Sequence, residues 1–192
     1  MRGFAIALIL LLAPAAAQAG PFGVERGMPL SKLQVIKKED QPFYYEIRVP
    51  SPHPNFETYI AVVTPEDGLC KITGIGKTLE GDADGTIARS VFNELHSALS
   101  AKYGNSKDFD FLHANSIWNE PNEWAMSLKQ NERSLASFWD REEHSNMPPD
   151  LSGITLQAHA VSSNGTYVNV SYEFSNSAAC STRSEASKNS VL

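Results

Sequence analysis

The 192-residue sequence predicts an α+β fold, in which an antiparallel sheet of about six to seven strands packs against one long amphipathic helix. Two observations predict it. Residues 86–103 carry apolar side chains at every fourth position, and short β-rich segments separated by turn residues lie on both sides of that stretch. The chain after residue 19 is long enough for one domain with a substantial core, which we place at residues 20–177.

Residues 1–19 have the layout of a secretory signal peptide. Arg2 supplies a positive start, residues 4–12 are apolar without interruption, and residues 17–19 (Ala-Gln-Ala) form a small-x-small cleavage site. The apolar run is shorter than the roughly 20 residues that cross a bilayer. A buried N-terminal helix is the alternative, but it would show a polar face. We therefore expect a periplasmic or secreted bacterial protein that begins at Gly20 and has no membrane span after cleavage.

The charge of the chain bears on its partners. The formal net charge is −6, and it becomes −7 when Arg2 leaves with the signal peptide. Nucleic-acid binding wants a basic surface, so the sequence argues against that class. An acidic surface suits a basic protein partner, although solubility alone also explains it.

Cys70 and Cys180 are the two cysteines of the chain. An even pair in an exported protein predicts a disulfide. Two free, buried thiols are the alternative.

The N-terminal third predicts a short helix and a three-stranded meander. Pro29 fits the first position of a helix, whose apolar stripe begins with Leu30 and Leu33 and which ends in the charged run 37–40. Three segments rich in aromatic and β-branched residues follow, separated by proline-containing loops. They are residues 43–49, 56–64 and 69–78.

Residues 86–103 predict the long helix. Asp84 or Thr86 can cap its first turn, and Gly104 fits the position just after its end. The apolar side chains recur at helical spacing and form one stripe. They are Ile87, Val91, Leu95, Leu99 and Tyr103.

The region after the helix predicts a loop and two strands. Residues 105–121 read as an irregular, packed loop that contains Phe109. Trp124, Met126 and Leu128 alternate with polar or small residues, which predicts a half-buried strand, and residues 133–139 return the chain.

The last hairpin predicts its own register. Apolar side chains alternate along residues 154–160 and along 168–174, and both sets must face the same side of the sheet. A two-residue Asn164-Gly165 turn would put them on opposite faces. We therefore expect an odd-length loop with Gly165 in the left-handed region, so that Ala160 pairs with Val168. The polar residues 178–192 predict a disordered tail.

Two sequences that resemble ligand loops fail on spacing. Residues 73–78 (Thr-Gly-Ile-Gly-Lys-Thr) end like a phosphate-binding loop, but Lys71 stands where the first glycine must lie. Residues 80–85 resemble the start of a calcium loop, but Val91 occupies the position of the bidentate glutamate. A looser calcium site on these oxygens is the alternative. We predict no cofactor and no metal ion.

No catalytic motif is present. The histidines show no zinc spacing, and no serine lies in a Gly-x-Ser-x-Gly turn. A hydrolase would need a site assembled from distant residues, for example around His96 or around Asp82 and Asp84.

Three residues are candidates for a binding surface. Phe109 and Trp118 are aromatic residues outside the predicted strands, and His53 lies in the proline-rich loop 50–54. Aromatic residues of a core are the alternative. The sequence favours a small exported, non-enzymatic protein-binding module, such as an inhibitor, immunity or envelope-assembly factor. A hydrolase and a structural envelope component are the alternatives.

Overall fold

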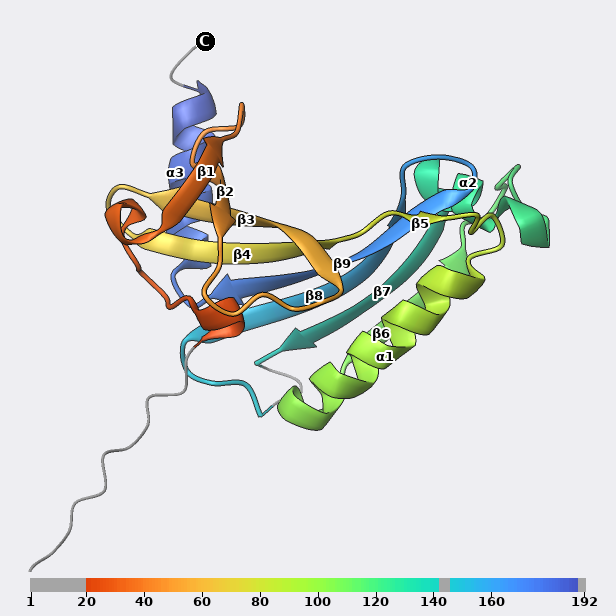
Figure 1. The fold of residues 1–192 in the computed structure, drawn as a ribbon, viewed down its shortest axis with the longest axis horizontal. Helices are drawn as coiled ribbons and strands as arrows, with labels where there is room; N and C mark the ends of the chain where they lie inside the picture. The colour runs from red at the N-terminus through yellow and green to blue at the C-terminus, as the bar shows by residue number, and fades with distance from the viewer. Residues whose placement is uncertain (1–19, 142–145, 190–192) are drawn as a thin grey trace, which may run out of the picture.

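The computed structural model describes residues 20–141 and 146–189, so the predicted signal peptide lies outside the described residues. The fold is α+β, with one large antiparallel sheet and helices around it (Figure 1). The strand order is β1-β2-β3-β4-β9-β8-β7-β6, and the short β5 also pairs with β9. The strands are β1 (Gln34–Lys38), β2 (Tyr44–Arg48), β3 (Phe56–Thr64), β4 (Gly68–Gly76), β5 (Leu79–Glu80), β6 (Lys107–Leu112), β7 (Arg133–Asp140), β8 (Leu151–Ala160) and β9 (Gly165–Phe174).

The sheet has nine strands, so the expected six to seven were too few. The meander β2-β3-β4 is present as predicted. The extra strands include β1, at the place where a helix was expected after Pro29. A single 3₁₀ turn, η2 (Leu30–Lys32), stands there instead, and residues 34–38 pair with β2. Pairing with β2 gives the backbone groups of residues 34–38 hydrogen-bond partners that a short, isolated helix would not supply.

The β8–β9 hairpin has the predicted faces but another register. Ala158 pairs with Val168 and Leu156 with Val170, which is two residues away from the expected pairing. The loop is odd in length and Val161 donates to the Gly165 carbonyl, but Gly165 does not have a positive φ. A shift of two residues keeps every side chain on its face, and the hydrophobic pattern therefore could not exclude it.

Helix α1 (Thr86–Tyr103) spans the predicted range and packs on one face of β8 and β9. Asp82, which is fully buried, accepts hydrogen bonds from the backbone N–H groups of Ile87 and Ala88 and from the hydroxyl of Thr166. The buried carboxylate thus satisfies free donors of the first helical turn. The helix ends at Gly104, whose φ is 90°.

Residues 124–128, predicted as a strand, lie in the short helix α2 (Trp124–Lys129). Trp124 and Leu128 are one helical turn apart and both are buried, so the same residues fit a helix as well as an alternating strand. The Trp124 ring lies against Gly85, where a β-carbon would collide with it and where φ is 75°. The 3₁₀ turn η3 (Pro121–Glu123) precedes α2, and η1 (Pro21–Gly23) opens the described chain.

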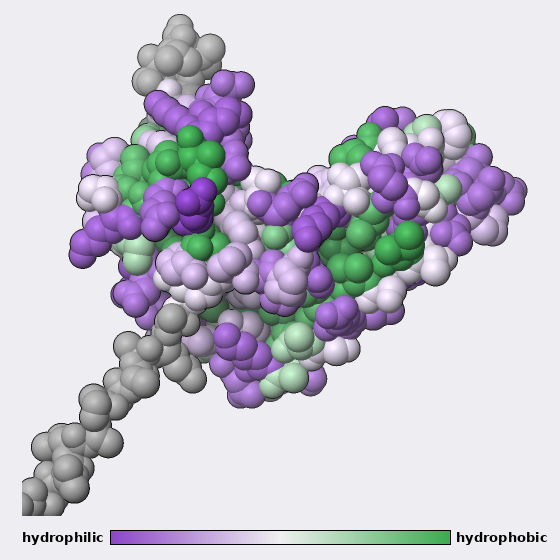
Figure 2. All heavy atoms as spheres, in the orientation of Figure 1, coloured by the Kyte–Doolittle hydropathy of each residue, from purple (hydrophilic) through white to green (hydrophobic). Residues whose placement is uncertain are grey.

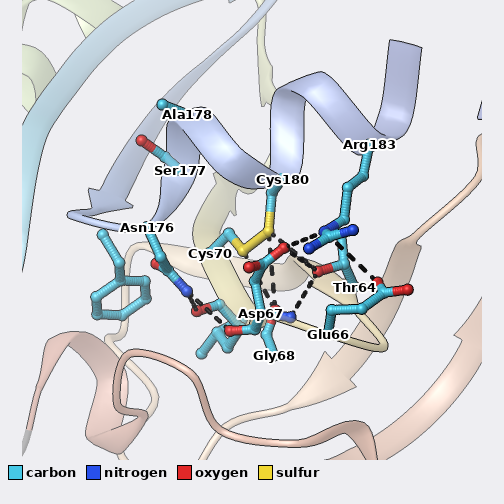
Figure 3. Close-up of a disulfide and its surroundings, with 12 residues drawn as sticks. Thr64, Glu66, Asp67, Gly68, Cys70, Asn176, Ser177, Ala178, Cys180 and Arg183 are labelled. Carbon is cyan, nitrogen blue, oxygen red and sulfur yellow. Dashed lines mark hydrogen bonds and ion pairs between the residues drawn. A yellow bond between two sulfur atoms is a disulfide. The ribbon is translucent and has the colours of Figure 1, made fainter. Parts of the chain in front are cut away.

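The predicted disulfide between Cys70 and Cys180 is confirmed (Figure 3). It joins β4 to α3 (Ser177–Asn189), a helix in the segment that was expected to be a disordered tail. Arg183 donates to Asp67 at 2.6 Å, and the Asn176 amide donates to the carbonyls of Asp67 and Leu69. These long-range contacts order a segment whose composition alone is typical of disorder.

We call the sheet face that carries α1 the inner face and the opposite one the outer face. Trp139, Ile154 and Tyr172 are aligned across three strands on the inner face, and Tyr172 contacts Tyr103 of α1. Both faces of β7 therefore differ sharply, because Trp139 is 1% exposed and its neighbour Phe138 is 38% exposed.

Candidate functional site

Strand β6 is an edge strand with an unusual distribution of side chains. It pairs with β7 over six consecutive residues without a register shift. Phe109 and Phe111 lie opposite Ala136 and Ser134, on the outer face that also carries Phe138. Asp108 and Asp110 point to the inner face, toward α1. Both phenylalanines of this strand thus face outward and both aspartates face the helix, the reverse of the usual pattern for a sheet with one covered face, although Leu112 shares the inner face with the aspartates.

The polar inner side of β6 is explained by its contacts with helix α1. Arg89 donates to Asp110 at 2.9 Å, and Arg133 lies 3.7 Å from the same carboxylate. Arg89 also stands over the ring of Trp124, 5.0 Å from its centroid. Because the aspartates that pair with these arginines occupy the inner side of β6, the phenylalanines lie on its outer side.

Phe109, Phe111 and Phe138 form what we call the aromatic patch. The rings of Phe109 and Phe138 are 5.6 Å apart and those of Phe109 and Phe111 are 6.4 Å apart, both edge to face. Phe111 is 42% exposed. Exposed aromatic clusters of this kind are typical of protein-binding surfaces.

A shallow depression of about 410 Å³ adjoins the patch. Phe109 and Phe138 line one side of it, and Lys107 and Glu173 contribute charged groups. Gly153 of β8 pairs with Asp140 on one side and with Glu173 on the other. Because it has no side chain, it does not fill the space between those two residues on the outer face. The depression could receive a side chain of a bound protein.

Apolar side chains are also exposed on β1, the other edge strand. Figure 2 shows apolar surface over the β1–β2 region, where Val35 is 43% and Ile36 57% exposed. The β1–β2 ladder is irregular between Val35 and Lys37. Val35 and Ile36 are adjacent in sequence and therefore do not share one strand face as the three phenylalanines do.

His96, Ser106 and Asp108 form a hydrogen-bonded cluster between α1 and β6. Nε2 of His96 lies 2.8 Å from Ser106 Oγ and 3.2 Å from Asp108 Oδ1, and Ser106 donates to Asp108 at 2.6 Å. In a catalytic triad the two ring nitrogens have different partners, and the serine gives its proton to the histidine. Here one nitrogen faces both groups and the serine donates to the carboxylate, so the cluster links helix to strand.

The carboxyl of Asp108 stays ionised more readily than usual. Burial raises its pKa, but the hydrogen bond from Ser106 and the interaction with His96 outweigh that effect, and the pKa is lowered overall. The side chain is 59% exposed. A charged carboxylate therefore stands at the sheet edge, on the opposite side of the strand from the aromatic patch.

The predicted binding residues fall in three different places. Phe109 is in the aromatic patch. Trp118 lies half-buried in the segment before α2, where its backbone N–H donates to Glu132. His53 lies in the β2–β3 loop, where its backbone N–H donates to the Tyr59 hydroxyl and its ring is 5.3 Å from Phe56. No contact among the described residues joins the three.

Phe111 and Phe138 of the patch were not selected among the predicted binding residues. Phe138 was placed in the predicted strand 133–139, and residues 105–121 were expected to be irregular, although 107–112 form β6. The signal was present in the sequence Asp-Phe-Asp-Phe at 108–111, which alternates as a strand does. Which side of this strand faces α1 depends on Arg89 and Arg133, which pair with Asp110 and are distant from it in sequence.

Another cavity, of about 560 Å³, lies where the N-terminal segment meets the end of α1. Arg26 and Asp150 line it and form an ion pair at 3.2 Å. Within residues 20–141 and 146–189 no three His, Cys, Asp or Glu side chains gather as metal ligands would. In the same part of the chain no helix is long and apolar enough to cross a membrane. Comparisons with protein-family models, with curated proteins and with solved structures found no match to this chain.

Proposed function

We propose that this chain is a small exported protein-binding module, of the inhibitor, immunity or envelope-assembly type, and that its partner covers the aromatic patch. The observation that carries the proposal is the reversed pattern of β6, which places an exposed Phe111 and a half-buried Phe109 on the outer face. Burying such rings against a partner removes a large apolar area from water. Export rests on the layout of residues 1–19, and the Cys70–Cys180 disulfide supports it because disulfides persist in oxidising compartments.

The proposal is tested by capturing partners from an envelope extract with purified mature protein. The Phe109→Ser/Phe138→Ser variant should lose the captured protein, since the substitutions remove one half-buried and one exposed ring of the aromatic patch. The Ile36→Ser variant is the matched control, because Ile36 is an exposed apolar residue on the other edge of the sheet. It should retain the partner.

A second variant tests the surface without removing an aromatic ring. Leucine at position 153 (Gly153→Leu) fills the depression, and a β-carbon there meets nothing closer than the Trp139 carbonyl at 3.8 Å. Calorimetry with the purified partner should show weaker binding by this variant and unchanged binding by Ile36→Ser. A partner that binds all variants alike contradicts the proposal, and capture of no partner would favour a structural envelope component.

A further inference from the structure

Within residues 20–141 and 146–189, no strand pairs with the edge of β6 that faces away from β7. His113 donates to the Glu132 carbonyl at 2.7 Å, which continues the β6–β7 register by one residue. Backbone direction alternates along an antiparallel strand, so Lys107, Phe109 and Phe111 also face β7. The backbone N–H and C=O groups of Asp108, Asp110 and Leu112 therefore point to the open edge.

The two edges of the sheet differ in protection. At β1 the ladder is interrupted between Val35 and Lys37, and two lysines, Lys37 and Lys38, stand on the strand. Irregular ladders and lysines are common devices against unwanted strand pairing. β6 also carries one lysine, Lys107, and the inward-facing Asp108 and Asp110, but its six-residue ladder with β7 is uninterrupted and two phenylalanines lie on its outer face. Its edge is therefore the better template for an added strand.

Resting on the proposed function, we infer that the partner contributes an extended segment that adds to the β6 edge as a tenth strand of the sheet. Apolar side chains of that segment lie opposite Phe109 and Phe111. These would be non-hydrogen-bonded positions, where facing side chains come closest. Recognition thus combines backbone hydrogen bonds with the aromatic patch.

The carboxylate of Asp108 indicates which residues the bound segment carries between its apolar positions. Asp108 has no lysine or arginine within ion-pair distance among the described residues, whereas Asp110 is shared by Arg89 and Arg133. A lysine or arginine opposite Asp108 would therefore add a permanent positive charge beside a carboxylate whose partners in the chain are His96 and Ser106. The segment alternates apolar and basic residues.

A second copy of this chain fits the edge less well. An antiparallel β6–β6 contact that aligns the phenylalanine faces puts Asp108 of one copy opposite Asp110 of the other. Like charges directly opposite each other destabilise a strand pair. A different chain with basic residues avoids that cost.

The test uses a synthetic peptide, Thr-Val-Lys-Val-Lys-Val-Thr, and amide hydrogen exchange followed by NMR on the mature protein. The peptide should slow exchange at Asp108, Asp110 and Leu112, while the amides of Phe109 and Phe111 are already protected by β7. A peptide with glutamate in place of lysine should bind about fivefold more weakly or worse, because attraction at Asp108 becomes repulsion.

A backbone variant separates strand addition from side-chain contact. Asp110→Pro removes one N–H that points to the free edge, and proline is tolerated on edge strands at such positions. It should weaken peptide binding about fivefold or more. Asp110→Ala removes the same carboxylate but keeps the N–H, so it is the reference for Asp110→Pro and should bind the peptide about fivefold more tightly than Asp110→Pro does.

The outcomes distinguish this inference from the proposed function. If the peptide shifts the phenylalanine signals without protecting the edge amides, or if Asp110→Pro and Asp110→Ala bind equally, strand addition is wrong and the aromatic patch stands. Absence of saturable peptide binding also overturns the inference. Protection of the edge amides in the free protein, together with a dimeric mass, would show that a second copy occupies the edge.

Discussion

Helices α1 and α3 flank the same sheet but are held to it in different ways (Figure 1). α1 buries five side chains against the inner face: Ala88, Phe92, Leu95, Leu99 and Tyr103. α3 lies against β3 and β4, and its buried side chains are Cys180 and Ser184. α1 is thus attached by its own apolar stripe, whereas α3 depends on one covalent bond and on the polar contacts of Arg183 and Asn176 (Figure 3).

A helix can therefore form where its own sequence does not predict one. The stripe of α1 predicts the helix and part of the face that packs. Leu95, Leu99 and Tyr103 of the predicted stripe are buried, but Ile87 is 42% exposed, and Ala88 and Phe92 are buried at that end of the helix. The residues of α3 are mostly Ser, Ala, Thr and Lys, and nothing in their spacing indicates a packed face. Three measurements test this difference between the two helices.

The largest effect is expected from Phe92→Ala in α1. Phe92 is 4% exposed, and its removal leaves a cavity between the helix and the sheet. The free energy of unfolding should fall by about 3–5 kcal/mol in urea denaturation. Asn93→Ala, an exposed neighbour on the same helix, should change it by less than about 0.5 kcal/mol. Equal losses in the two variants would mean that α1 is not held by its apolar stripe.

The second effect concerns the disulfide. The Cys70→Ser/Cys180→Ser variant should lose about 2–4 kcal/mol of stability, because the bond closes a loop with a sequence separation of 110 residues. Amide exchange should accelerate throughout α3. In α1 it should accelerate only as much as the lower global free energy of unfolding requires. If the α3 amides remain protected in this variant, the polar contacts alone hold that helix.

The smallest effect is a pH dependence of the α3 contact. The hydrogen bond from Arg183 lowers the pKa of Asp67 below its usual 3.8, with a further contribution from Thr64 and an opposing one from burial. A lowered carboxyl pKa gives stabilisation that is complete above the usual pKa and is lost as the pH falls through the lower, folded-state pKa. After correction for the intrinsic pH dependence of exchange, the protection of the α3 amides should therefore fall in that acidic window in wild type but not in Asp67→Asn. Identical profiles would remove Asp67 from the attachment of α3.

Strand prediction shows where local pattern stops being sufficient. Residues 56–64 read as a strand and form β3 with the same bounds, since β-branched residues there are flanked by clear turn residues. Residues 124–128 read as a strand and form a helix, because the same apolar positions satisfy both periods and the place beside Gly85 decides between them. Short apolar segments carry this ambiguity in general.

The candidate site was predictable in composition but not in geometry. Phe109 was singled out from the sequence, and the Asp-Phe-Asp-Phe alternation around it contained the strand. Which side of that strand faces the core was set by Arg89 and Arg133, distant residues whose ion pairs claim the carboxylates. Trp118 and His53 lie elsewhere, because the loops that carry them are placed by the sheet and not by any local signal.

The sequence by itself determined helix α1, the three-strand meander and the pairing of the two cysteines. Each rests on a local period, on flanking turn residues or on a count that admits a single pair. The tertiary structure alone decided the outward face of β6, the register of the β8–β9 hairpin and the existence of α3. In these cases the stabilising contacts come from residues far along the chain. Two arrangements with the same local pattern therefore differ in free energy only once those distant residues are in place.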